Sequence, residues 1–273
     1  MRCVIALVLA LGAATAAAAE PDAATPEAVL EAAFANRYEV DTISEMEIVV
    51  RDRGGSEQRR LVHAVSKRVD GRSQSIGRVL EPASLRGLTV LISEVAGGGR
   101  DIFVYLPALL RARRVAGAQR LESFLGSDLT YEDFERQRAA DFTVEALPSE
   151  EVAGERCTVL RALPREPRGY AAVVLAVAPD HAILEYRYFA RDAATPYRVI
   201  ETPRSDMHSE AGHLVPTRYA VRQPERGSST DLVLRKLAVD PTIDDQLFSV
   251  RTLDQQRPLP RVRAAASGAR DEP

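Results

Sequence analysis

The chain has 273 residues, with 36 basic and 39 acidic side chains, a formal net charge of −3 and no tryptophan. Charges of both signs are interspersed, which gives no indication of a nucleic-acid partner and is typical of a solvated surface. The length allows one large β domain or two small ones. Because there is no internal repeat and no clear linker, we expect one domain.

The first residues have the three parts of a secretory signal. Arg2 supplies the positive charge, Cys3 to Thr15 form the apolar stretch, and Ala17 to Ala19 form the small-residue cleavage site. We therefore expect residues 1–19 to be a cleaved signal peptide and the protein to be periplasmic. A signal anchor is the alternative, but the apolar run is shorter than the ~20 residues of a membrane span.

The two cysteines have different expected fates. Cys3 precedes the apolar run, so it leaves with the signal peptide and predicts no lipid anchor. Cys157 then stands alone, which excludes an intramolecular disulfide. Arg156 beside it would favour a reactive thiolate, whereas its place at the start of an apolar strand favours a buried, inert thiol.

The N-terminus of the mature chain has the pattern of an amphipathic helix. Thr25 is a candidate cap, Pro26 stands at the first helical position, and apolar residues recur at three- and four-residue spacing as far as Asn36. The apolar face of this helix predicts that it covers another element.

From Ser44 onward the hydrophobic period changes to two, which predicts a half-buried strand with Met46, Ile48 and Val50 on one face. Turn residues then recur about every 10 to 15 residues, as in an antiparallel meander. Further strands are expected around 61–65, 78–80, 88–93, 102–105, 157–163, 170–178, 182–189, 197–202, 214–221 and 231–239. Residues 109–129 are expected to be irregular and to precede a short helix over residues 130–138.

These elements predict a mainly β protein in which a strongly curved antiparallel sheet is covered by one to three short helices. The predicted domain runs from residue 20 to residue 254. Residues 255–273 are rich in Gln, Arg, Pro and Ala without periodicity, which predicts a disordered tail. Because so few helices cannot cover the apolar surface completely, part of the concave face is expected to form a ligand pocket.

No constellation typical of an enzyme occurs in the sequence. His208 and His213 have a spacing that converges on no metal, and the chain contains no Gly-x-Ser-x-Gly turn. Adjacent carboxylates such as Glu132 and Asp133 fit caps and turns better than acid and base roles. We therefore expect a non-enzymatic protein without metal or cofactor.

Two segments resemble the outer-membrane lipoprotein-sorting, LolA-like family. That family carries a Tyr-Leu-Pro-x-x-x-Arg-x-Arg stretch followed by a Gly-Ser-Asp-Phe-Thr-like segment. The matching runs here are Ile102 to Arg114 and Phe124 to Phe134, with weaker matches at Gly154 with Cys157, Leu214 to Arg218 and Asp245 to Ser249. The chain departs from the pattern at Leu129, where an aromatic residue is usual, and it is similar to the broad group rather than to the lipoprotein carrier itself.

The resemblance implies an unclosed antiparallel β-barrel whose hollow is capped by helices and holds the acyl chains of lipids or lipoproteins. It also implies a periplasmic setting, often beside inner-membrane exporters of the resistance-nodulation-division (RND) type. We expect a monomer with no nucleic-acid partner.

Candidate site residues follow from this expectation. The predicted lipid-binding residues are Met46, Ile48, Val50, Tyr105, Leu106, Phe124, Leu125 and Leu129. The predicted lid or rim comprises Gly126, Ser127, Asp128 and Tyr131, with Gly126 as a hinge. The predicted contact with lipid head groups or with an acidic partner comprises Arg111, Arg113 and Arg114, a cluster that a solvated loop would also explain.

Two functions remain open at this point. The first is a carrier of lipid or lipoprotein acyl chains in an apolar hollow. The second is an adaptor subunit of an envelope export complex, in which the same β shell has a filled core and acts through its surface. A filled interior would exclude the carrier.

Overall fold

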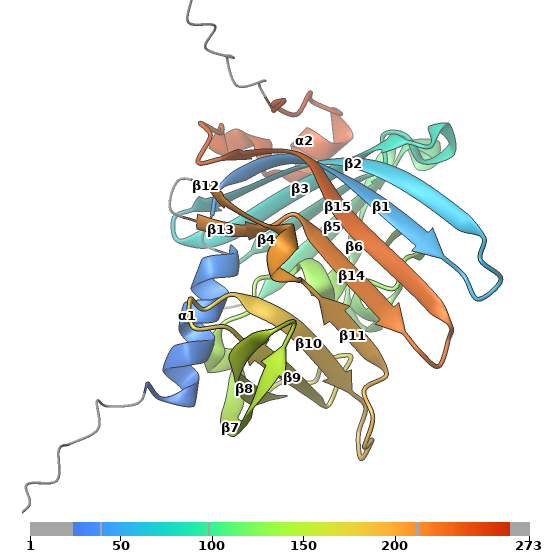
Figure 1. Cartoon of the computed structure of the whole chain (residues 1–273). Helices are drawn as coiled ribbons and strands as arrows, with labels where there is room; N and C mark the ends of the chain where they lie inside the picture. The colour runs from blue at the N-terminus through green and yellow to red at the C-terminus, as the bar shows by residue number, and fades with distance from the viewer. Residues whose placement is uncertain (1–23, 39, 98, 211–212, 263–273) are drawn as a thin grey trace, which may run out of the picture.

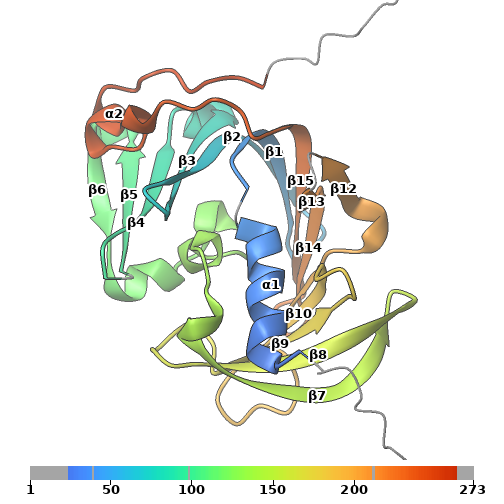
Figure 2. The same ribbon diagram turned by 90° about the vertical axis from the view of Figure 1, so that its left-hand side faces the viewer.

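The computed structural model describes residues 24–38, 40–97, 99–210 and 213–262. The predicted signal peptide and most of the predicted tail lie outside these residues. A strongly curved antiparallel sheet wraps around helix α1 (Pro26–Tyr38), as Figures 1 and 2 show. None of the helices in the described part of the chain is long and apolar enough to cross a membrane.

The sheet contains thirteen strands among the described residues, in the spatial order β6-β5-β4-β3-β2-β1-β15-β14-β11-β10-β9-β8-β7. The strands of its first arm are β1 (Thr42–Arg51), β2 (Glu57–Val69), β3 (Arg72–Glu81), β4 (Thr89–Glu94), β5 (Arg100–Leu106) and β6 (Arg111–Val115). Those of its second arm are β7 (Phe142–Val152), β8 (Glu155–Pro164), β9 (Ala172–Val177), β10 (Ile183–Phe189), β11 (Arg198–Glu201), β14 (Arg218–Gln223) and β15 (Ser228–Val239). A separate hairpin comprises β12 (Met207–Glu210) and β13 (His213–Pro216).

The first and last strands join the two arms. β1 pairs with β15 from Thr42 opposite Val239 to Arg51 opposite Ser229. The edge strands β6 and β7 lie at the two ends of the sheet order, so the barrel is not closed. The predicted fold class, a curved and unclosed antiparallel sheet with few helices, is confirmed.

Helix α1 begins where the sequence predicts. The Ala28 N–H donates to Thr25 Oγ1 (3.2 Å), as expected of a cap. The helix ends at Tyr38, slightly beyond the predicted Asn36. Leu30 and Phe34 are buried on the concave side of the sheet, where the ring of Phe34 lies 6.0 Å from that of Phe142.

The alternation predicted for the first strand is also present. Met46, Ile48 and Val50 belong to the main core on the concave side. Ile43 belongs to a separate cluster on the convex side, beneath helix α2 (Val250–Asp254). One strand therefore contributes to both layers, as period-two alternation requires.

The segment between the two arms differs most from the prediction. Residues 109–129 are not irregular throughout, because Arg111–Val115 form strand β6. Their arginines conceal the strand in the sequence, but charged side chains are common on exposed sheet edges. The predicted helix over residues 130–138 is wrong: the chain makes short 3₁₀ turns at Tyr131–Phe134 and Ala139–Asp141 instead.

The sequence analysis did not predict strands β7 and β12. The strand expected over residues 214–221 is divided into β13 and β14. Most outward-facing positions of β7 are polar and exposed, so its pattern lacks the apolar run of a buried strand. By contrast, every residue of β9 is buried, and the strand lies between β8 and β10 within the sheet.

Residues 116–141, here called the crossing segment, connect β6 to β7 on the concave side (Figure 2). Asp133 accepts two hydrogen bonds from Arg198, both at 2.8 Å, and both side chains are buried. Although burial alone would lower the pKa of Arg198, the Asp133 carboxylate raises it above its ordinary value. Glu135, fully buried, pairs with Arg120 in the same way.

The convex face beside α2 is covered by residues that follow the helix. Leu259 and Val262 pack against the cluster that contains Tyr105. The buried His63 side chain lies 2.7 Å from the Pro260 carbonyl oxygen. Residues 255–262, which the sequence assigns to a disordered tail, thus lie on the sheet, because Leu259 and Val262 supply apolar contacts that the composition of the tail conceals.

Cys157 is free and fully buried in a small cluster with Ala176, Ala178 and Leu184. Burial raises the pKa of its thiol, which disfavours the thiolate. Both observations agree with the inert thiol rather than the reactive one.

Loss of the Asp133 carboxylate should destabilise the crossing segment strongly. Asp133→Ala leaves the Arg198 guanidinium buried without its anion, so we expect a loss of about 3–5 kcal/mol in the free energy of unfolding, measured by urea denaturation. The double variant Asp133→Leu/Arg198→Leu removes both charges and should recover most of that loss. If Asp133→Ala is as stable as the native protein, the Asp133–Arg198 pair does not anchor the crossing segment.

Candidate functional site

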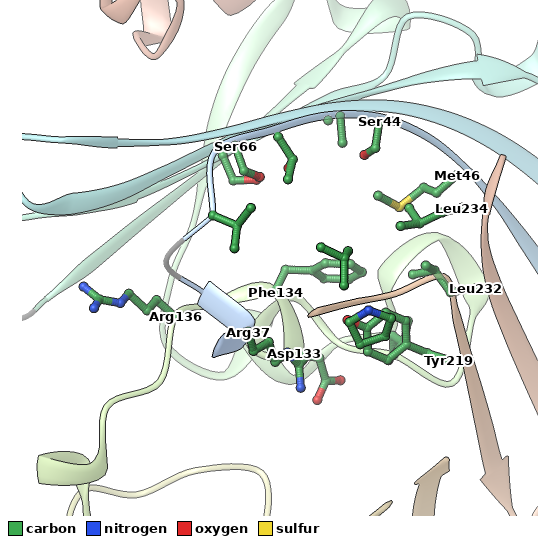
Figure 3. A pocket seen from close by; sticks show the side chains of 18 of the residues that line it. Arg37, Ser44, Met46, Ser66, Asp133, Phe134, Arg136, Tyr219, Leu232 and Leu234 are labelled. Carbon is green, nitrogen blue, oxygen red and sulfur yellow. The ribbon is translucent and has the colours of Figure 1, made fainter. Parts of the chain in front are cut away.

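A cavity of ≈ 260 Å³ remains inside the curve of the sheet, here called the central cavity. It lies between the concave face of the sheet, the end of α1, the crossing segment and β13 (Figure 3). The protein's own side chains therefore do not fill the interior completely, whereas a filled interior would have excluded a carrier.

Small side chains on β1, β2 and β3 make this hollow. Ser44 lies opposite Ala64, and Ala64 lies opposite Gly77 on the next strand. Thr42 pairs with Ser66, and Ser66 pairs in turn with Ser75. The backbone of three adjacent strands is thus continuous here, while the side chains are too short to fill the space above it.

The hydroxyl-bearing members of this set form what we call the hydroxyl wall: Thr42, Ser44, Ser66, Ser73 and Ser75. Ser44 and Ser66 lie on the sheet side of the cavity in Figure 3. The hydroxyls of Ser66 and Ser75 are 2.9 Å apart and share a hydrogen bond.

Further along the same strands the lining becomes apolar. Met46 follows Ser44 on β1, and Val62 precedes Ala64 on β2. Across the cavity, the rings of Phe124 and Phe134 pack 4.6 Å apart. Leu129, Tyr219, Leu232 and Leu234 belong to this apolar part, whereas Leu237 lies opposite Ser44 and Ile92 lies opposite Ser75, beside the hydroxyl wall.

A bulge in β15 adds to the apolar lining. The pairing with β1 passes from Lys236 to Leu234, so Arg235 is the extra residue. The bulge changes the alternation, and both Leu234 and Leu237 line the cavity as a result.

Arg37 of α1 and Arg136 of the crossing segment also border the cavity. Arg37 donates to the Tyr186 hydroxyl (2.5 Å), and its guanidinium lies over the Tyr186 ring at 5.1 Å. Arg136 Nη1 lies 3.7 Å from Glu94 Oε2. The lining is therefore mixed, with hydroxyl-bearing and apolar side chains together on the sheet side and two arginines at its border.

The structure places the predicted lipid-binding residues in three settings. Met46, Phe124 and Leu129 line the central cavity. Ile48, Val50, Leu106 and Leu125 belong to the same concave core but do not line it. Tyr105 lies on the opposite, convex face with Leu91 and Leu253, because odd-numbered residues of β5 point away from the hollow.

The predicted lid or rim is tied to the sheet. Asp128 is buried and accepts hydrogen bonds from Ser228 Oγ (2.6 Å) and Thr230 Oγ1 (2.9 Å). Ser127 is also buried, while Tyr131 packs edge-to-face on Phe124 with ring centroids 5.6 Å apart. Gly126 has φ +73° in a tight turn, and this backbone conformation alone favours a glycine. The glycine is therefore no evidence for a hinge. A hinged lid would have to break the Asp128 contacts.

The predicted arginine cluster lies on the edge strand β6. Arg114 pairs with Asp101, whereas Arg111 and Arg113 have no ion pair with any residue that the structure describes. Leu109 and Leu110, directly before this strand, are 59% and 78% exposed. The structure thus joins two cations to two exposed leucines, a combination that the sequence analysis did not consider.

The sequence analysis missed the hydroxyl wall. The signal was present, because Ala64 with Ser66, and Ser73 with Ser75 and Gly77, alternate with larger residues on their strands. Small polar residues at alternate positions are equally typical of a solvent-exposed face, whereas here they face a hollow.

A second hollow of ≈ 290 Å³ lies beside the crossing segment, near Leu121, Glu132 and Tyr197. Burial raises the pKa of the Glu132 carboxyl, although the Gly169 N–H donates to its Oε2 at 3.0 Å. Arg198, which also borders this hollow, is bound to Asp133. These charged groups are already paired within the protein and hold the crossing segment in place.

The central cavity is lined mainly by apolar and hydroxyl-bearing side chains. Its lining among the described residues includes neither histidine nor cysteine. Within the same part of the chain, no group of three His, Cys, Asp or Glu side chains is arranged to hold a metal ion.

Comparison with known proteins identifies the fold. The model of a family described as "Uncharacterized protein" matches residues 71–255. No curated protein sequence matches the chain. Among solved structures, a domain assigned to outer-membrane lipoprotein sorting from Vibrio parahaemolyticus is similar with a TM-score of 0.76 and 20% identity, over 83% of this chain and 97% of that one.

Two further structures have the same fold. A DUF1329 family protein from Desulfovibrio piger has a TM-score of 0.73 and 25% identity, over 78% of this chain and 91% of that one. A LolA superfamily protein from Nitrosomonas europaea has a TM-score of 0.65 and 21% identity, over 83% and 98%. The chain therefore belongs to the matched family of uncharacterized proteins, and its fold is that of the broad outer-membrane lipoprotein-sorting, LolA-like group.

Proposed function

We propose that this protein is a non-enzymatic periplasmic carrier that holds part of an acyl chain of a lipid or lipoprotein in the central cavity. The observation that carries the proposal is the hollow of ≈ 260 Å³ inside the curve of the sheet. The similarity to a domain assigned to lipoprotein sorting supports an acyl cargo, and the predicted signal peptide supports the location.

The size of the cavity limits what it can hold. Since an apolar cavity of ~150 Å³ accepts benzene with its six carbons, a cavity of ≈ 260 Å³ has room for roughly ten carbons. At ~0.8 kcal/mol for each methylene removed from water, ten carbons gain about 8 kcal/mol before the costs of ordering. In this conformation a longer chain would extend out of the cavity.

Filling the cavity should abolish uptake. Ala64→Phe places a phenyl ring in the hollow, so we expect binding of a fluorescent fatty acid to fall at least about tenfold with little loss of stability, because the ring enters empty space. Uptake is measured by fluorescence titration. Thr158→Phe, which adds the same ring to an exposed position of β8, is the matched control and should bind normally. Equal uptake by both variants would exclude the central cavity as the site.

A second candidate role is docking to an anionic membrane surface through Leu109, Leu110, Arg111 and Arg113, here called the docking surface. The exposure of both leucines and the absence of an ion pair with described residues for both arginines favour it. Leucines can enter the lipid interface while arginines contact phosphate groups. The acidic surface of an exporter, for example one of the RND type, is the competing partner.

Removal of these features should reduce membrane binding in a charge-dependent way. We expect the protein to sediment with vesicles that contain phosphatidylglycerol and much less with pure phosphatidylcholine vesicles. Arg111→Gln/Arg113→Gln should reduce the bound fraction several-fold at low salt, since each cation near the surface is worth about 1 kcal/mol. Arg156→Gln/Arg226→Gln loses the same charge elsewhere and should bind normally. No binding to anionic vesicles would leave the protein partner as the alternative.

A further inference from the structure

Two arginines are buried among the residues that the structure describes, and they differ in their partners. Arg198, 3% exposed, binds the Asp133 carboxylate through two hydrogen bonds of 2.8 Å. Arg60, 7% exposed, donates from Nη2 to Gln58 Oε1 (2.7 Å), while its Nε and Nη1 have no hydrogen-bond partner in the described part of the chain. Because the Gln58 amide is neutral, it does not compensate the charge of Arg60.

The sheet around Arg60 is apolar. Arg60 lies opposite Ile48 on β1, which is fully buried, and Val62 is the next inward-facing residue on β2. Burial lowers the pKa of the Arg60 guanidinium, whereas the Asp133 carboxylate raises that of Arg198. A buried cation without an anion is unfavourable, and ionisable groups perturbed in this way cluster at binding and catalytic sites.

Other arginines already perform the structural task at the crossing segment. Arg198 and Arg120 each bind a buried carboxylate of that segment, those of Asp133 and Glu135. Arg60 lies against the same segment, since its Nη2 is 3.5 Å from the position that a Cβ would take at residue 126. It pairs with no carboxylate of the described residues there, which leaves its charge available for an anion from outside the chain.

Arg60 lies beside the central cavity, although it does not line it in this conformation. Val62 and Ala64 follow on the same face of β2, and both border the cavity. Two residues of strand span ~7 Å, and an arginine side chain is long enough to cover that step. One hydrogen bond to Gln58 holds the guanidinium in its present position. A rotation of the side chain toward Val62 therefore brings the guanidinium to the wall of the cavity.

We propose that Arg60 binds the ionised head group of the cargo, a carboxylate or a phosphate, while the acyl chain occupies the central cavity. Either oxyanion supplies the negative charge that Arg60 lacks, and a guanidinium binds both through paired N–H groups. The inference rests on the proposed function and deepens it. The cargo is an amphiphile with a free ionised head, such as a fatty acid or a monoalkyl phosphate, rather than the ester- or amide-linked chain of a lipoprotein.

Ligands with the same decyl chain and different heads test the proposal. We expect decanoic acid or decyl phosphate to displace the uncharged fluorescent probe N-phenylnaphthylamine from the full mature chain at about ten- to a hundredfold lower concentration than decanol, the ratio that hydrogen bonds to a charged group give. The anion that competes better identifies the head group. In Arg60→Met this preference should disappear, while decanol binds within about twofold of its original affinity.

Arg78→Met is the matched control. Arg78 lies on the neighbouring strand β3, on the convex face with Ile76, and its buried Nη2 has no hydrogen-bond partner in the part of the chain that the structure describes. Its removal takes the same charge from the opposite face, so the preference for the anion should remain. Arg60→Lys keeps the charge and should retain part of the preference.

Thermal melts show whether each variant is folded. Arg60→Met should melt no lower than the native protein, because the substitution removes a buried charge that has no anion. The comparison of the three ligands on the native protein requires no variant.

The outcomes separate this inference from the proposed function. If the anions and decanol compete equally on the native protein, or if Arg60→Met keeps the preference, Arg60 does not bind the head group and the carrier function stands. If Arg60→Met and Arg78→Met lose the preference equally, the effect is one of net charge and the inference is likewise wrong. If the native protein takes up neither the probe nor a fatty acid, the carrier function itself fails.

Discussion

A sheet bent around a helix has a concave face that must be covered, and in this protein the cover is a segment of irregular chain. Such a segment has few regular backbone hydrogen bonds, so side chains must fix it. The paired carboxylates and arginines of the crossing segment, above all Asp133 with Arg198 and Glu135 with Arg120, do so in the interior. The shape of the hollow depends on these pairs, because they hold Phe124, Leu129 and Phe134 at a fixed distance from the sheet.

The other wall of the hollow is determined by the opposite property, the lack of side-chain volume. Ser44, Ala64 and Gly77 lie side by side on three strands and leave the backbone ladder intact while they leave space above it. A rigid wall of this kind is suited to binding without large rearrangement, because little order has to be created when a guest enters.

The similarity to solved structures concerns the fold, so the cargo has to be inferred from the residues of the cavity. At 20% identity to the lipoprotein-sorting domain, the shell can persist while the lining changes. The hydroxyl wall and the arginines that border the cavity are therefore read from this chain alone. The exposed leucines before β6 are likewise read from this chain. They favour a role of the surface in addition to binding in the cavity.

The sequence by itself determined the class of fold, because alternation with a period of two and regularly spaced turn residues are local properties. It also determined helix α1, through the Thr25 cap and the apolar spacing, and the buried state of Cys157, through the apolar strand around it. Of the site, it found Met46, Phe124 and Leu129. The tertiary structure alone decided which polar faces look inward: Ser44, Ser66 and Ser73 alternate as solvent-exposed residues would, and only the curvature of the sheet turns them toward a hollow. It also decided that Tyr105 faces away from the cavity and that Arg111–Val115 form an edge strand, because both depend on the position of a strand within the sheet. The anchoring of the crossing segment by Asp128 and Asp133 depends on partners more than 60 residues away in the sequence.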